Sequence, residues 1–136
     1  MHNPEKRFEI IVSYFEAVNA DRFGESASYF AEDGRFVLPG RPAATGRIAI
    51  AAELQWALRH YETHLDTVVD LRSRNTYLVD VDIRFEGTLR AGRSLIAFSV
   101  TDTFQFEPNT PAISELRTVY DRKTVDGLLR RALRGD

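Results

Sequence analysis

The chain has 136 residues, no cysteine, and a formal net charge of −2 with both signs scattered along it. This length suits one domain, 1–136, with its own hydrophobic core. Without thiols there are no disulfides and no zinc–thiolate sites, and the charge balance gives no electrostatic footprint for nucleic acid or an anionic membrane. No apolar run approaches the ~20 residues that span a bilayer, and no signal peptide is recognisable, so we expect a cytoplasmic protein.

Helical periodicity dominates the first half of the chain. Apolar residues at helical spacing predict a first helix over 4–19, and Tyr14 borders its apolar stripe. Asp21 is placed to cap a short second helix. A third helix is predicted over 45–61, with Thr45 as its cap.

Strand-like patterns surround and follow the third helix. Residues 32–34, Glu-Asp-Gly, predict a turn into a short strand over 35–38. After the third helix the period changes to two, with Gly87 as a candidate bulge. The later strands are predicted over 65–74, 77–85, 94–107 and 112–121. A basic amphipathic helix is predicted over 125–134.

This order of elements predicts an α+β fold. Three helices of the N-terminal half would cross the opening of a cone-shaped, strongly curved, mixed or antiparallel sheet. Such a cone keeps a pocket at its mouth. We expect the following residues to line or flank that pocket: Phe36, Leu38, Trp56, Val100, Leu116, Thr118 and Tyr120.

Three segments carry a family resemblance: YFEAVNAD at 14–21, YFAEDGRFVLPG at 29–40 and TGRIAI at 45–50. With the order of elements, they resemble the nuclear-transport-factor-two-like superfamily, specifically its SnoaL-like and ketosteroid-isomerase-like branch. The resemblance implies a cystatin-like α+β barrel over nearly the whole chain. It selects no activity, because this superfamily includes isomerases, dehydratases, cyclases, epoxide hydrolases and non-catalytic binding domains.

Ketosteroid isomerase gives the sharpest comparison. Its first-helix tyrosine lies in a Tyr-x-x-Ala-hydrophobic-Asn setting, which residues 14–19 match, and its oxyanion-hole aspartate lies in Asp-x-Phe-x-Phe, which residues 102–106 match. Its general base is an aspartate before a proline, where this chain has Leu38 before Pro39. A supporting tyrosine of its third helix falls at Leu54. Steroid isomerisation itself is therefore not expected, because leucine cannot accept a proton.

Asp102 is the first candidate catalytic residue. It lies in an otherwise apolar inward row between Val100 and Phe104, where burial should raise its pKa and preserve a neutral acid. Such an acid can donate a hydrogen bond to a carbonyl or a developing enolate, as in ketosteroid isomerase. Tyr14 would be the second donor. The alternatives are a solvated or structural carboxylate, in a different strand register, and a core tyrosine.

His64 is the candidate general base, with Asp66 on the same side of the strand at period two. A surface histidine at a helix-to-strand junction is the alternative. His60 lies four residues earlier, but no third ligand is fixed, so no metal site is predicted. The chain has no glycine-rich phosphate loop, nucleophile elbow or P-loop, and we expect no cofactor.

These features predict a SnoaL-like, cofactor-free enzyme of isomerase, cyclase or dehydratase type. Its substrate would be a small, largely apolar carbonyl-bearing or polycyclic compound, polarised by Asp102 and Tyr14, with His64 or a group on the substrate as base. The alternative is a non-catalytic ligand-binding or dimerisation domain of the same fold. The resemblance, with Leu95, Ala97 and Ile113 expected to face outward, predicts a homodimer. Neither nucleic acid nor a membrane is an expected partner.

Overall fold

The computed structural model describes residues 4–134, which form four helices and six strands. The helices are α1 (Pro4–Asn19), α2 (Phe23–Ser28), α3 (Arg47–Leu58) and α4 (Arg122–Arg134). The strands are β1 (Phe30–Val37), β2 (Ala44–Thr45), β3 (Tyr61–Ser73), β4 (Leu78–Leu89), β5 (Leu95–Phe106) and β6 (Ile113–Val119). Across residues 4–134, no helix has the length and apolar character needed to cross a membrane.

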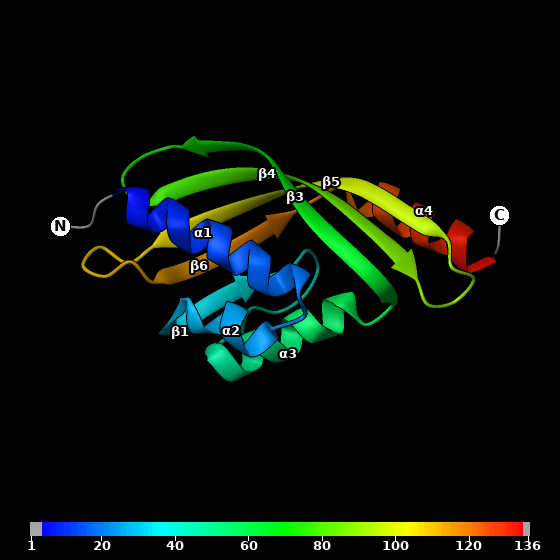
Figure 1. Ribbon diagram of the computed structural model, residues 1–136, viewed down its shortest axis with the longest axis horizontal. Helices are drawn as coiled ribbons and strands as arrows, with labels where there is room; N and C mark the ends of the chain where they lie inside the picture. Colours follow the sequence, from blue (N-terminus) through cyan, green and yellow to red (C-terminus); the bar gives the residue numbers. More distant parts are fainter. Residues whose placement is uncertain (1–3, 135–136) are drawn as a thin grey trace.

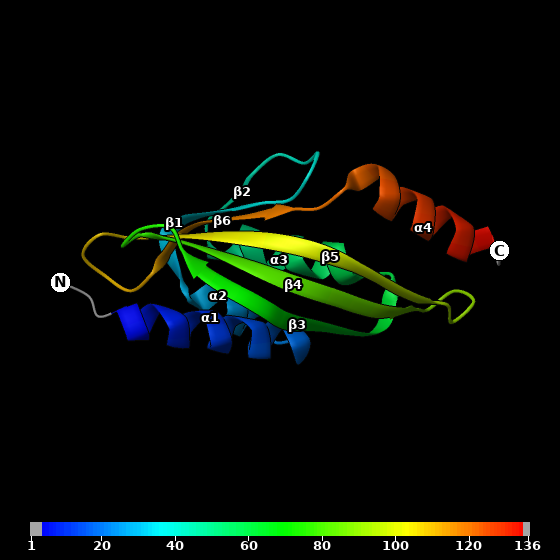
Figure 2. The same cartoon turned by 90° about the horizontal axis from the view of Figure 1, so that it is seen from above.

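The strands form one curved sheet in the order β2-β1-β6-β5-β4-β3. Only the β1–β6 pair is parallel among the described strands, so the sheet is mixed. Figure 1 shows α1, α2 and α3 gathered on one side of the sheet. Helix α4 lies at the end of the molecule opposite to the start of α1 (Figure 2). The predicted α+β class with three helices over a curved sheet is confirmed, and α4 adds a fourth helix against β5.

The first helix has its predicted bounds, but the next two elements differ from the prediction. Asp21 does not cap α2: it adopts a left-handed φ of +60°, and Arg22 occupies the N-cap without a side-chain hydrogen bond. Residues 32–34 do not turn the chain, since they continue β1, which begins at Phe30. The pairing with β6 is irregular between Phe30 and Arg35, and this irregularity accommodates the residues expected to turn.

The third helix is shorter than predicted at both ends. Thr45 lies in β2, where it pairs with Arg35 of β1, and therefore does not cap α3. Gly46 precedes the helix with a φ of +90°, which glycine adopts without steric cost. At the other end, Tyr61 already belongs to β3.

The inward rows of β4 and β5 follow the predicted alternation. Val79, Val81, Ile83 and Phe85 of β4 are buried. On the inward row of β5, Phe98 and Val100 are partly buried and the other members are buried: Ile96, Asp102, Phe104 and Phe106. Gly87 is not a bulge, because it pairs in register with His64 and Ile96. Ile113, expected to face outward, is fully buried in the core where β6 begins.

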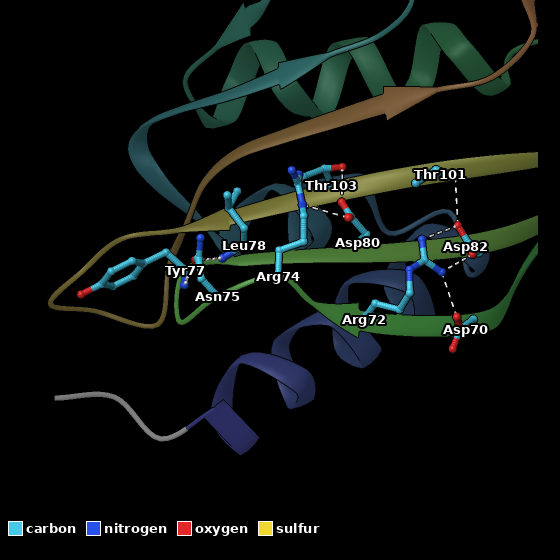
Figure 3. A network of polar contacts seen from close by, with 10 residues as sticks. All are labelled: Asp70, Arg72, Arg74, Asn75, Tyr77, Leu78, Asp80, Asp82, Thr101 and Thr103. Atoms are coloured by element: carbon cyan, nitrogen blue, oxygen red, sulfur yellow. Dashed lines mark hydrogen bonds and ion pairs between the residues drawn. The ribbon is translucent and has the colours of Figure 1, made fainter.

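The outward face of β3, β4 and β5 is polar over much of its length. Arg72 pairs with Asp82 across the two strands, and the Thr101 hydroxyl donates a 3.0 Å hydrogen bond to the same carboxylate (Figure 3). The neighbouring set repeats this arrangement: Arg74, Asp80 and Thr103. Exposed pairs of this kind contribute little stability each, but they help to fix the strand register. The sheet therefore has one charged face and one apolar face.

Candidate functional site

A cavity of about 350 Å³ is lined by residues from α1, α3 and α4 and from the inward faces of β1 and β3–β6. This volume is at the small end of the range for ligand sites. Its inner end is formed by buried residues: Tyr14, Val18, Leu54 and Asp102. Its outer end is formed by exposed residues: Trp56, Arg59, His60 and Arg122. The cavity therefore opens to solvent at one end and is closed by the core at the other.

Asp102 lies at the inner end and is only 6% exposed. It pairs on β5 with Val81 of one neighbouring strand and Thr118 of the other. The pKa of the Asp102 carboxyl is raised to about 7. Burial is the largest cause, the hydrogen bond from the Thr118 hydroxyl opposes it, and the charge of Asp66 adds to it. At neutral pH this carboxyl is therefore present in both protonation states and is suited to give or take a proton.

Tyr14 brings a phenol to the same inner end. Its ring packs edge-on against the rings of Phe15, Phe30 and Phe104, and the residue is 3% exposed. Burial raises the pKa of the Tyr14 hydroxyl well above its ordinary value, and the charges of Asp102 and Asp66 raise it further. The hydroxyl therefore stays protonated and can act as a hydrogen-bond donor.

Asp66 is the acidic residue whose importance sequence reasoning missed, since it was considered only as a neighbour of His64. It lines the cavity from β3, and burial raises the pKa of its carboxyl to about 6, an effect that nearby His64 opposes. The Asn19 side chain holds its backbone from both sides: Nδ2 donates to the Asp66 carbonyl at 3.0 Å and Oδ1 accepts from the Asp66 amide at 2.8 Å. This link between α1 and β3 fixes the position of the carboxyl.

His64 is not part of the cavity lining. Its Nε2 lies 2.5 Å from Asp21 Oδ1, beyond the end of α1, and its Nδ1 is buried without a hydrogen-bond partner among residues 4–134. Although His64 and Asp66 share a face of β3, Asp21 covers the first while the cavity opens over the second. The structure thus brings Tyr14, Asp66 and Asp102 together and places His64 elsewhere.

Six of the seven residues expected around the pocket line the cavity: Phe36, Leu38, Trp56, Val100, Thr118 and Tyr120. Leu116 does not, because it is fully buried in the core. Leu38 lines the wall where a related isomerase has its base, so no proton acceptor lies at that point. Helix α4 adds a part of the wall that was not predicted from the sequence, made by Val125, Asp126 and Leu129. The amphipathic pattern of this helix was the only sequence signal that one of its faces would be covered. In residues 4–134, no cluster of three or more His, Asp or Glu side chains suits a metal ion.

Comparison with known proteins places this geometry in a family. A family model described as a SnoaL-like domain matches residues 11–110. Curated proteins offer no match to the chain. Solved structures do: a protein with a ketosteroid isomerase-like fold from Catenulispora acidiphila, in complex with trimethylamine, is 17% identical, with a TM-score of 0.78 over 88% of this chain and 91% of that one.

Two further structures are similar over most of their length. SalBIII, described as an epoxide hydrolase/cyclase-like enzyme in pyran ring formation in the polyether salinomycin, is 21% identical, with a TM-score of 0.76 over 90% of this chain and 96% of that one. An NTF2-like protein of unknown function from Burkholderia pseudomallei is 12% identical, with a TM-score of 0.80 over 90% of this chain and 96% of that one. At such identities these likenesses establish the fold and leave the chemistry to the site.

Proposed function

The chain belongs to the SnoaL-like domain family, and on that premise we propose that it is a cofactor-free acid–base enzyme for a small, largely apolar compound. The compound carries a carbonyl or another reactive oxygen, on a ring system small enough for a cavity of about 350 Å³. One observation carries the proposal: two carboxyl groups with raised pKa values and a phenol line one largely apolar cavity. Perturbed carboxyl groups in a cleft are typical of catalytic sites.

Each group has a role that its environment suits. The Tyr14 hydroxyl and the protonated form of Asp102 donate hydrogen bonds to the substrate oxygen and stabilise the negative charge that develops on it. Asp66, whose pKa of about 6 lies below neutral pH, is mostly ionised there and accepts the substrate proton. Returning that proton to another carbon gives an isomer. When the substrate has a hydroxyl group β to the carbonyl, the enolate instead expels that group, the proton held by Asp66 converts it to water, and a dehydration product remains.

In this proposal Asp66 takes the role of base that the sequence suggested for His64. His64 is held by Asp21 outside the cavity, and Leu38 has no proton acceptor. Asp66 lies on β3, across the inward face from the end of β1, so a substrate would present its acidic carbon to a different wall than in ketosteroid isomerase. SalBIII, whose description names epoxide hydrolase and cyclase chemistry, is consistent with acid–base catalysis on an oxygen-bearing substrate in this fold.

The experiment is an activity screen on small cyclic ketones, hydroxyketones and epoxides, read by mass spectrometry and by NMR exchange of the acidic proton into deuterated water. Asp102→Asn and Asp66→Asn should each lower the rate on any substrate found by about 100-fold or more, and Tyr14→Phe by about 10- to 100-fold. Asp70→Asn, on the exposed part of β3, is the matched control and should retain the wild-type rate.

The alternative function is non-catalytic binding of a small ligand by the same cavity, for which Leu38 is the supporting observation. Ligands that bind without turnover or proton exchange, with all four variants binding equally, would establish this alternative and contradict the enzyme.

A homodimer that pairs through the outward face of the sheet remains part of the proposal. Leu95 and Val119 are exposed by 69% and 54%, and they could supply apolar contacts between the charged rows. Ile113 cannot contribute, because it is buried in the core. Light scattering at micromolar concentration should give twice the monomer mass of 15.5 kDa, and a monomer would contradict the dimer.

A further inference from the structure

The outer end of the cavity is basic. Arg41, Arg59 and Arg122 all line it, from the segment after β1, from the end of α3 and from the start of α4. Their acidic neighbours are Glu53, which pairs with Arg41, and Asp126, which also lines the cavity. His60 adds little charge at neutral pH, because partial burial and the charge of Arg59 lower its pKa below its ordinary value. Positive charge therefore exceeds negative charge at the outer end.

Two of these guanidinium groups are held in place by Trp56. The Arg41 guanidinium carbon lies 3.5 Å from the Trp56 ring centroid and that of Arg59 lies 4.0 Å from it. At such short distances the two groups cannot share one face of the ring without overlapping, so they stack on opposite faces. Arg41 is also bound by Glu53 through two hydrogen bonds, at 2.8 and 2.9 Å. Among residues 4–134, Arg59 donates only from Nη1, to the Trp56 carbonyl, and therefore keeps in-plane donors for a ligand.

The third guanidinium is positioned by a glycine. A Cβ at residue 40 would lie 2.5 Å from Arg122 Nη1, so the guanidinium packs against the backbone of Gly40. Gly40 has a φ of +71°, a conformation that also favours glycine. Arg122 therefore reaches from α4 across to the segment after β1, at the edge of the cavity.

Acidic and basic side chains occupy different parts of the cavity. Asp102 at its inner end and Asp66 on its wall repel an anion when they are ionised, and apolar side chains lie beside them, with Phe85, Phe98 and Val100 in the wall. An anionic group would therefore avoid the inner end and approach the arginines. A wholly neutral ligand would leave these donors unused.

We propose that the substrate of this site is an amphipathic anion: a carboxylate or comparable anionic group bound by Arg59 and Arg122 at the outer end, joined to an apolar body. Binding of the anion by the arginines does not depend on the proposed function. Only the orientation of the bound substrate rests on that function, with its reactive oxygen next to Tyr14, Asp66 and Asp102. Arg59 and Arg122 act in binding and orientation, since they lie at the exposed outer end of the cavity.

Binding can be tested without turnover, because Trp56 is the only tryptophan and lines the cavity. The probes are decanoate, decan-1-ol and decylammonium, titrated at pH 8 by tryptophan fluorescence and by calorimetry. Decanoate should bind at least about tenfold more tightly than decan-1-ol, as expected for charge-assisted hydrogen bonds, and decylammonium should bind most weakly. Equal binding of acid and alcohol, tighter binding of the ammonium, or no binding of decanoate would overturn the proposal.

The variants separate a specific effect from a damaged fold. Arg59→Gln and Arg122→Gln, singly and together, should reduce the preference for decanoate while leaving the affinity for decan-1-ol within about twofold. Arg84→Gln, on the exposed outward face of β4, is the matched control and should keep the preference. If the double variant keeps the full preference for decanoate, the arginines do not bind the anion. Loss of this preference leaves the activity test of Asp66 and Asp102 unaffected, so the two proposals can fail separately.

Discussion

The Thr118 hydroxyl donates a 2.7 Å hydrogen bond to Asp102 Oδ1 across the pairing of β5 with β6. It opposes the effect of burial, because a hydrogen bond donated to a carboxylate stabilises the charged form. The pKa of Asp102 near 7 is therefore a balance between a desolvated environment and one hydroxyl from the neighbouring strand.

Removing that hydroxyl should raise the pKa of Asp102. In Thr118→Val the effect of burial is unopposed, and the carboxyl should remain protonated to higher pH than in the wild type. Thr118→Ser keeps a hydroxyl and is the control. The measurement is an NMR titration of the aspartate side-chain carboxyl carbons. An unchanged or lowered pKa in the valine variant would show that the hydrogen bond does not set the proton affinity.

Asp102 should make the protein less stable as the pH rises. Its pKa of about 7 in the folded protein lies above the ordinary value of 3.8, so the folded state holds the proton more tightly than the unfolded state. This contribution is fully present below about pH 4 and is lost as the pH rises towards 7. Asp102→Asn removes the effect, and its stability relative to wild type should increase by about 3 kcal/mol between pH 4 and pH 8.

Urea unfolding of both proteins at several pH values measures this difference. Asp66 contributes a similar dependence that ends near its pKa of about 6, and most of it cancels in the comparison because both proteins contain Asp66. A difference that is the same at pH 4 and pH 8 would mean that Asp102 is not buried as described.

Asn19 should be important for both stability and the position of Asp66. Asn19→Ala removes two hydrogen bonds to the Asp66 backbone and leaves its amide and carbonyl without these partners, at a cost of about 1 to 3 kcal/mol. Asn75→Ala removes two hydrogen bonds at an exposed turn, where water replaces them, and should cost less. Thermal unfolding of the two variants gives the comparison, and equal losses would argue against a special role for the link from α1 to β3.

Gly87 should not tolerate a side chain, whereas Gly24 should. A Cβ at residue 87 would lie 2.5 Å from Tyr61 Cδ1, so Gly87→Ala must displace a ring that lines the cavity, at a cost of about 1 to 3 kcal/mol. Gly24 lies within α2 with no atom within 4 Å of such a Cβ, and Gly24→Ala should stabilise the protein by about 0.5 to 1 kcal/mol. Chemical unfolding distinguishes them, and similar effects at both positions would contradict the packing around Tyr61.

Local sequence patterns predicted the elements well where one rule dominated. Alternation in β4 and β5 correctly indicated which side chains face inward, because burying one face of a sheet fixes the register. The short segments between α1 and α3 were predicted less well. There Glu-Asp-Gly at 32–34 suggested a turn, but pairing with β6, distant in the sequence, keeps these residues in a strand.

The sequence by itself determined the fold and part of the cavity wall: an α+β fold with Tyr14 and Asp102 on inward faces, and Leu38 where a related enzyme has its base. Only the tertiary structure decided which other groups join them. His64 and Asp66 share a face of β3, and the sequence cannot show that Asp21 covers the first while the cavity opens over the second. The arginines at the outer end come together from segments up to about 80 residues apart. Such groupings depend on packing between elements, which spacing along one element does not encode.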